Sequence, residues 1–191
     1  LLADFKSVPS EVAELASMSM ELISMDAWDE FYDSEEELKR AKKEQMQKVL
    51  EGLPWIAAID RFQQWIYTTP HTADERRAEW ENIMSYLSSS KVNWDGHEKA
   101  YQNLWQRQLH LYEVPFYYVE YGMAQLGAIA MWRSYKHLGN TALDNYDAAL
   151  KLGYTKSIGE LYQTAGIEFN FSQEYVKELA NFINKELSYM N

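Results

Sequence analysis

The 191-residue sequence contains no cysteine, which excludes a disulfide framework. A reducing cytoplasm fits this composition and is the location that we expect, although a chain without cysteine is compatible with any compartment. Basic residues are also scarce, because 18 lysines and arginines face 29 aspartates and glutamates and leave a net charge of -11. Such a chain has no basic stripe to neutralise phosphates or to meet an anionic lipid surface. We therefore expect neither nucleic acid nor a membrane as a partner.

Several functional motifs are absent as well. The sequence has no H-E-x-x-H zinc motif, no glycine-rich phosphate-binding loop and no G-x-S-x-G nucleophile elbow. It also lacks an initiator methionine, and its first residues do not have the basic and apolar regions of a signal peptide. Two interpretations of this start stay open: a processed or engineered terminus, or the later part of a longer protein.

The residues that are present favour a globular, all-helical chain. Hydrophobic residues make up 47% of the sequence, which is enough for a core. Apolar residues recur at helical spacing, and capping residues or glycines mark the ends. The expected helices cover residues 10–25, 34–66 with an interruption at Pro54, 72–87, 98–110, 115–137, 140–152, 157–165 and a final helix capped by Ser172. We predict a single all-α domain over residues 1–191, with one extended piece at residues 167–171.

The longest apolar run covers residues 114–132. Its length invites comparison with a membrane-spanning helix. Glu120 and Gln125 interrupt the run, however, and charged residues flank it on both sides. The pattern therefore predicts a helix buried in the core of a globular domain.

A histidine and three tyrosines gather on either side of a proline at the start of this run. His110 precedes the proline, while Tyr117, Tyr118 and Tyr121 follow it, and Tyr118 and Tyr121 share one helix face. Aromatic packing with locally satisfied hydroxyls is one interpretation of such a cluster. The functional interpretation makes Tyr121 a hydrogen-bond donor to an oxyanion and His110 a second donor or a substrate contact. Both interpretations stay open on the sequence alone.

Two glutamates punctuate an apolar helical run near the start of the chain. Glu14 and Glu21 lie seven residues apart, two turns along one helix face. They form either a solvent-facing acidic stripe or a functional pair. In the functional interpretation one carboxylate is a zinc ligand, and the other orients a metal-bound imidazole from outside the ligand set.

Four segments of the chain resemble one known family. Residues 8–22 are similar to the segment that follows the zinc-binding helix of oligoendopeptidase F, and residues 105–127 are similar to its catalytic tyrosine segment. Residues 149–155 and 161–169 fit the same family, a relative of thimet oligopeptidase, so the resemblance covers nearly the whole chain. It implies an all-α fold, the C-terminal part of a zincin-like helical peptidase domain with a deep substrate channel. The implied activity is that of a zinc metalloendopeptidase that hydrolyses oligopeptides.

The resemblance also implies roles for individual residues. Glu14 matches the third ligand of a single zinc ion, and Glu21 matches a carboxylate that supports a zinc-bound histidine. Tyr121 matches the tyrosine that stabilises the tetrahedral oxyanion, and His110 a histidine that binds the substrate and its transition state. Tyr118 matches a tyrosine that contacts the peptide, and we group Tyr117 with it as substrate-binding.

One departure from the family is large. The two zinc-binding histidines and the general-base glutamate of the family are absent from these residues and would lie before Leu1. We therefore expect the chain alone to bind no zinc and to be inactive, because one carboxylate does not make a zinc site. The expected partners are oligopeptides, the missing N-terminal part of the same enzyme and further copies of the chain through exposed apolar surface. The alternative is a helical module that binds peptides or serves as a scaffold without cleaving them.

Overall fold

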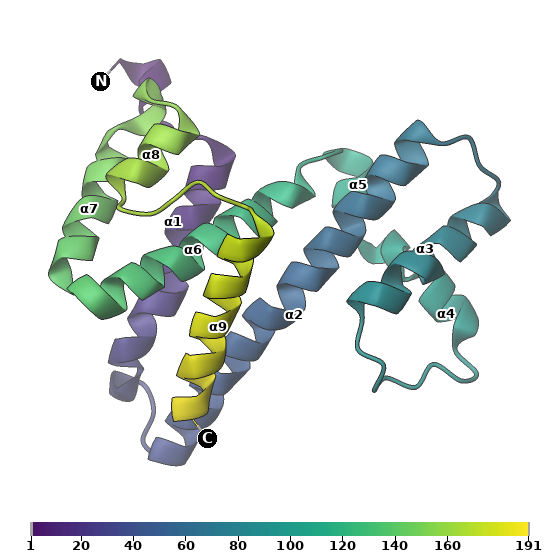
Figure 1. The fold of residues 1–191 in the computed structure, drawn as a ribbon, viewed down its shortest axis with the longest axis horizontal. Helices are drawn as coiled ribbons and strands as arrows, with labels where there is room; N and C mark the ends of the chain where they lie inside the picture. The colour runs from purple at the N-terminus through teal and green to yellow at the C-terminus, as the bar shows by residue number, and fades with distance from the viewer. Residues whose placement is uncertain (1, 191) are drawn as a thin grey trace. The chain divides into compact units, whose positions relative to one another are not determined.

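A computed structural model of the chain describes residues 2–190. Every regular element within this range is a helix, which confirms the all-α prediction. The α-helices are α1 (Ser10–Ile23), α2 (Glu35–Thr68), α3 (Ala73–Leu87), α4 (Glu98–Gln102), α5 (His110–Glu113), α6 (Tyr118–Leu138), α7 (Asn140–Lys151), α8 (Ile158–Thr164) and α9 (Gln173–Tyr189) (Figure 1). Short 3-10 helices are η1 (Ala3–Phe5), η2 (Ser24–Glu30), η3 (Leu104–Arg107) and η4 (Gly153–Thr155).

The chain divides into two compact units. Unit 1 contains residues 2–49 and 123–190, and unit 2 contains residues Leu50–Gly122. Helices α2 and α6 each contribute residues to both units. We predicted a single domain over residues 1–191, in which the two units would belong together. This stays a prediction.

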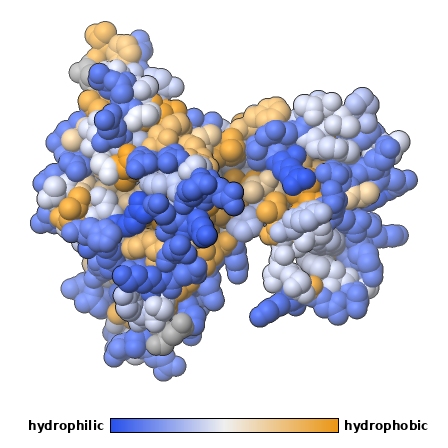
Figure 2. Space-filling view, viewed as in Figure 1, coloured by the Kyte–Doolittle hydropathy of each residue, from blue (hydrophilic) through white to orange (hydrophobic). Residues whose placement is uncertain are grey.

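Hydrophilic and hydrophobic side chains both lie at the surfaces of the two units. Blue, hydrophilic residues cover most of the face shown in Figure 2, and orange, hydrophobic residues lie between them. Some large apolar side chains are strongly exposed, including Phe31 in unit 1 at 80% and Tyr86 in unit 2 at 74%. No helix within residues 2–190 is long and apolar enough to span a membrane.

The core of unit 1 depends on close packing around α6. Gly127 is buried on this helix, and a β-carbon built there would lie 2.8 Å from Leu15 Cδ1 of α1 and 2.9 Å from the Tyr162 ring of α8. The hydroxyl of Tyr162, which is fully buried, donates a hydrogen bond to the carbonyl oxygen of Met123 at 3.3 Å. A glycine is therefore needed at 127 for the helices to approach this closely.

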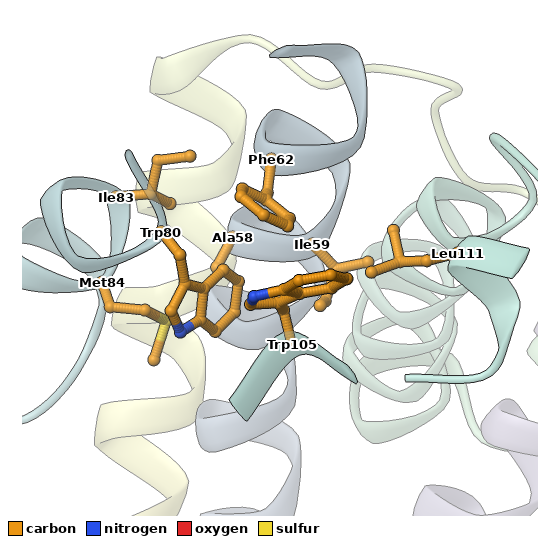
Figure 3. Close-up of a cluster of buried hydrophobic side chains, with 8 residues drawn as sticks. All are labelled: Ala58, Ile59, Phe62, Trp80, Ile83, Met84, Trp105 and Leu111. Atoms are coloured by element: carbon orange, nitrogen blue, oxygen red, sulfur yellow. The ribbon is translucent and has the colours of Figure 1, made fainter. Parts of the chain in front are cut away.

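The core of unit 2 is built from aromatic rings. Phe62 of α2 lies 5.1 Å from the ring of Trp80 and 5.2 Å from that of Trp105, measured between ring centroids. Trp80 is fully buried, and its indole nitrogen donates to the carbonyl oxygen of Tyr101 at 3.0 Å, so its one polar group is satisfied. The complete cluster is Ala58, Ile59, Phe62, Trp80, Ile83, Met84, Trp105 and Leu111 (Figure 3). This core holds the end of α2 against the segment that leads into α5.

Three local features differ from the expectations. Helix α2 continues through Pro54 without a break. The expected helix over residues 98–110 is divided into α4, η3 and the start of α5, and the Asn103 side chain donates to the Lys99 carbonyl oxygen at 2.7 Å. Such local side-chain bonds compete with helix continuation. Residues 167–171 are irregular and form no strand.

Candidate active site

The histidine and the tyrosines lie on two short helical segments joined by a sharp turn. His110 begins α5 and Tyr118 begins α6. Between them, Phe116 adopts a left-handed backbone conformation with φ of 65°, which is uncommon for a residue other than glycine. This turn follows Pro115, and it starts α6 three residues later than the sequence predicts.

The structure brings the four predicted aromatic residues together within unit 2. The His110 ring lies 4.9 Å from the Tyr118 ring, 5.5 Å from the Tyr121 ring and 6.2 Å from the Tyr117 ring, measured between centroids. Tyr121 in turn lies 5.4 Å from both other tyrosines in edge-on contacts. All four side chains are partly buried. Tyr118 also packs against the buried hydrophobic cluster of unit 2.

Each ring nitrogen of His110 lies within hydrogen-bond distance of a neighbouring side chain. Its Nε2 atom lies 3.3 Å from the Tyr121 hydroxyl, and its Nδ1 atom lies 2.7 Å from Nε2 of Gln108. The Gln108 carbonyl oxygen accepts a hydrogen bond from the indole nitrogen of Trp55 at 3.0 Å. The guanidinium group of Arg107 lies over the Trp55 ring at 4.6 Å. Trp55, Arg107 and Gln108 were not predicted as site residues. The one signal in the sequence is that Gln108, a polar residue, lies two positions before His110.

The surroundings keep the Tyr118 phenol protonated. Burial raises the pKa of Tyr118, and the neighbouring Tyr121 adds to this effect, while the Trp55 side-chain hydrogen bond and the Arg107 charge oppose it. The net direction is upward, so the hydroxyl keeps its proton at neutral pH. Tyr118 is therefore able to donate a hydrogen bond to a ligand.

The two glutamates lie on α1 in unit 1. Helix α1 buries Val12, Leu15 and Leu22, whereas Glu14 is partly buried and Glu21 is exposed. The Glu21 carboxylate accepts a hydrogen bond from Gln45 Nε2 of α2 at 3.0 Å. Because these glutamates and the His110 cluster belong to different units, their convergence on one reaction stays a prediction.

A complete zinc site does not fit the residues that the structure describes. Within residues 2–190, no group of three or more histidine, cysteine, aspartate or glutamate side chains is arranged to hold a metal ion. Zinc in proteins takes at least three protein ligands. Glu14 offers one carboxylate, which is too few for a zinc site, so its predicted role as a zinc ligand stays a prediction.

The fold is similar to known peptidase structures. A crystal structure at 3.1 Å of a protein provisionally identified as oligoendopeptidase F matches with a TM-score of 0.83 and 27% identity, over 98% of this chain and 33% of that one. PZ peptidase A with an inhibitor matches with a TM-score of 0.83 and 26% identity, over 98% of this chain and 33% of that one. A protein from Bacillus anthracis str. Ames, also provisionally identified as oligoendopeptidase F, shares the fold at 22% identity with a TM-score of 0.73, over 99% of this chain and 30% of that one.

The chain therefore spans about a third of the length of the structures that it matches. No curated protein sequence matches it. The sequence profile of Peptidase family M3, however, matches residues 2–181, which is nearly the whole chain. This match agrees with the resemblance carried by the tyrosine segment and the α1 segment, and it shows that the chain belongs to peptidase family M3.

Proposed function

We propose that this chain is the part of a zinc metalloendopeptidase that binds oligopeptides and stabilises the oxyanion formed during hydrolysis. Two observations support the proposal. Membership of family M3 extends over residues 2–181. The hydrogen-bonded pair of His110 and Tyr121 offers polar donors within an aromatic cluster, which is the kind of environment in which oxyanions are stabilised.

Each residue of the cluster has a role in this proposal. Tyr121 donates its hydroxyl proton in a hydrogen bond to the oxygen of the scissile carbonyl as negative charge develops there. His110 holds the Tyr121 hydroxyl in place and contributes to the stabilisation of the oxyanion through this contact. Tyr118 and Tyr117 contact the bound peptide, and the upward shift in the pKa of Tyr118 favours a donating phenol.

The glutamates of α1 serve the metal side of the same reaction. Glu14 is the proposed ligand of one zinc ion, and Glu21 is the proposed support for a zinc-bound histidine. Since the described residues offer no complete zinc site, the work that we assign to this chain is the binding and stabilisation of substrate. We propose that the other ligands and the general base belong to the rest of the enzyme, which is the main partner of these residues.

Oligopeptides are the proposed substrate class. The family resemblance implies a channel between helical lobes, and such a channel admits flexible peptides and excludes folded proteins. The matched structure of PZ peptidase A carries an inhibitor, which is a property of that protein. The exposed apolar side chains of this chain also support self-association as a second kind of contact.

The gene and the isolated chain together test the proposal. The reading frame before Leu1 is expected to encode an H-E-x-x-H motif, and the longer product is expected to hydrolyse peptides. The 191-residue chain alone is expected to show neither peptide hydrolysis nor bound zinc. A start codon at Leu1 would support the non-catalytic peptide-binding module instead. Hydrolysis at a normal rate by the isolated chain would also contradict the proposal.

A further inference from the structure

The hydrogen bonds around His110 have only one consistent direction. The indole nitrogen of tryptophan is a donor and never an acceptor. Trp55 Nε1 therefore donates to Gln108, and the atom that it contacts at 3.0 Å must be the carbonyl oxygen Oε1. This contact fixes the orientation of the Gln108 amide, whose oxygen and nitrogen are otherwise hard to distinguish.

The orientation of the amide fixes the position of the ring proton on His110. The Gln108 NH₂ group lies 2.7 Å from His110 Nδ1, and an amide NH₂ only donates. Nδ1 must therefore accept, which means that it carries no proton. A neutral imidazole has one proton, so this proton is on Nε2, the atom that lies 3.3 Å from the Tyr121 hydroxyl.

We propose that Trp55 and Gln108 are positioning residues that hold His110 in its Nε2–H tautomer, so that His110 Nε2 donates and the Tyr121 hydroxyl oxygen accepts the hydrogen bond between them. The assignment of the tautomer rests on the contacts alone, and its catalytic meaning rests on the proposed function. When the Tyr121 oxygen accepts a hydrogen bond, its O–H group becomes more polarised and is a stronger hydrogen-bond donor.

The other tautomer would have the opposite effect. With the proton on Nδ1, the unprotonated Nε2 would accept the hydrogen bond from the Tyr121 hydroxyl. The phenol proton would then point to the histidine, and Tyr121 would donate to His110 instead of accepting from it. The tautomer of His110 therefore decides the direction of the hydrogen bond between His110 and Tyr121, and only the Nε2–H form is compatible with the donor role that the proposed function gives to Tyr121.

Tyr118 competes for one of these contacts. Its hydroxyl interacts with the Trp55 side chain, and this interaction opposes the rise in the pKa of Tyr118. The distance of 3.0 Å to Gln108 makes the amide oxygen a direct partner of the indole nitrogen. A Tyr118→Phe variant removes the competing oxygen, and we expect it to leave the His110 tautomer unchanged.

The chain contains an internal reference with the opposite tautomer. His71 Nδ1 lies 2.6 Å from the carbonyl oxygen of Thr69, which only accepts, so Nδ1 carries the proton. His71 Nε2 lies 3.0 Å from Nε of Arg76, which only donates. In one sample, the ring proton should therefore be on Nε2 in His110 and on Nδ1 in His71.

Nitrogen-15 NMR of the 191-residue chain tests the proposal. Long-range ¹H–¹⁵N spectra at alkaline pH, where imidazole rings are neutral, separate protonated from unprotonated ring nitrogens. The signals of His110 and His71 are assigned by their loss in His110→Asn and His71→Asn variants. We expect an unprotonated Nδ1 and a protonated Nε2 for His110, and the reverse for His71. A protonated Nδ1 on His110 in the unmodified chain overturns the proposal.

Two variants test the positioning residues separately. Gln108→Glu replaces the donating amide by an accepting carboxylate and should move the proton to Nδ1. Trp55→Phe removes the indole donor, so the amide is free to turn, and both tautomers should become populated. If either variant keeps the single Nε2–H form, the proposal fails for that residue.

A matched control separates the hydrogen bond from the loss of an indole ring. Trp132 is fully buried in unit 1, and its indole nitrogen has no hydrogen-bond partner among the described residues. Trp132→Phe should therefore leave the His110 signals unchanged, and a shift to mixed tautomers there would contradict a specific role for Trp55. Circular dichroism confirms that each variant is folded. The spectra need neither substrate nor metal, so their outcome is independent of the test of peptide hydrolysis.

Discussion

Trp55 and Gln108 are 53 positions apart in the sequence, yet a hydrogen bond joins their side chains. Contacts of this kind are invisible to periodicity and spacing, which report only on neighbours along one helix. The grouping of His110 with Tyr118 and Tyr121 was predictable because all three lie within one short segment. The direction of the hydrogen bonds within this group was not predictable, because it depends on the indole of Trp55, which is distant in the sequence.

Glycine 127 shows how a single residue limits the packing of unit 1. Replacing it by alanine would place a β-carbon 2.8 Å from Leu15 and 2.9 Å from the buried ring of Tyr162. Because Tyr162 is fully buried and cannot move aside easily, we expect Gly127→Ala to reduce the free energy of unfolding by about 1–3 kcal/mol. Chemical denaturation followed by circular dichroism measures the change.

The matched control is the same substitution on an open helix in the same unit. A β-carbon at Gly159 of α8 meets no atom within 4 Å. Gly159→Ala should therefore stabilise the chain, by about 0.5–1 kcal/mol, because alanine loses less backbone freedom on folding. Equal effects of the two substitutions would show that packing around position 127 is not tight.

Helix starts were the most predictable features at the scale of elements. The capping box expected at Thr72 and Glu75 is complete: the Thr72 amide donates to Glu75 at 2.7 Å, and the Glu75 amide donates to Thr72 at 3.3 Å. At Ser34 the described contact is the hydrogen bond from the Glu37 amide, at 3.1 Å. Helix ends were less predictable, because the end of α4 coincides with a local hydrogen bond from the Asn103 side chain to the Lys99 carbonyl oxygen.

A further capping box at the start of α8 makes stability depend on pH. Hydrogen bonds from Ser157 and the charge of Lys156 lower the pKa of Glu160 from 4.5 to about 2. A carboxylate whose pKa is lower in the folded state stabilises above the unfolded pKa, and this contribution is lost as the pH falls from 4.5 toward 2. Glu160→Gln keeps the capping geometry but cannot ionise.

We expect the Glu160→Gln variant to lose less stability than the unmodified chain over this pH range. The thermal midpoints of both proteins are measured in steps from about pH 6 to about pH 2.5, the range in which carboxyl groups take up protons. The difference between the two curves reports the contribution of Glu160. If the thermal midpoints of the two proteins changed equally with pH, the capping contacts would not lower the pKa of Glu160.

At the scale of the whole molecule, the chain covers about a third of the peptidases that it matches. The tyrosine segment and the α1 segment carried the family resemblance, and the profile match over residues 2–181 confirms it. The division into two units was not predicted from the sequence. The reason is that α2 and α6 are continuous helices, so no linker composition marks the boundary between the units.

Exposed apolar side chains predict self-association of the isolated chain. Phe31 is 80% exposed and Leu2 is 74% exposed in unit 1, and Tyr86 is 74% exposed in unit 2. Sedimentation velocity should show an apparent mass that rises above the monomer mass of 22.4 kDa with concentration. Phe31→Ser should weaken the association, and a single monomeric species at all concentrations would contradict the prediction.

The most direct test of the central claim is the kcat of the longer, zinc-loaded enzyme that we propose for these residues, measured with a Tyr121→Phe substitution. The account predicts a decrease of about 10²–10³-fold in kcat, the usual cost of losing one oxyanion donor, with no change in zinc content. Tyr86→Phe, which changes an exposed tyrosine outside the aromatic cluster, is the matched control and should retain full activity. An unchanged kcat for the Tyr121→Phe enzyme would contradict the role of Tyr121 in stabilising the oxyanion.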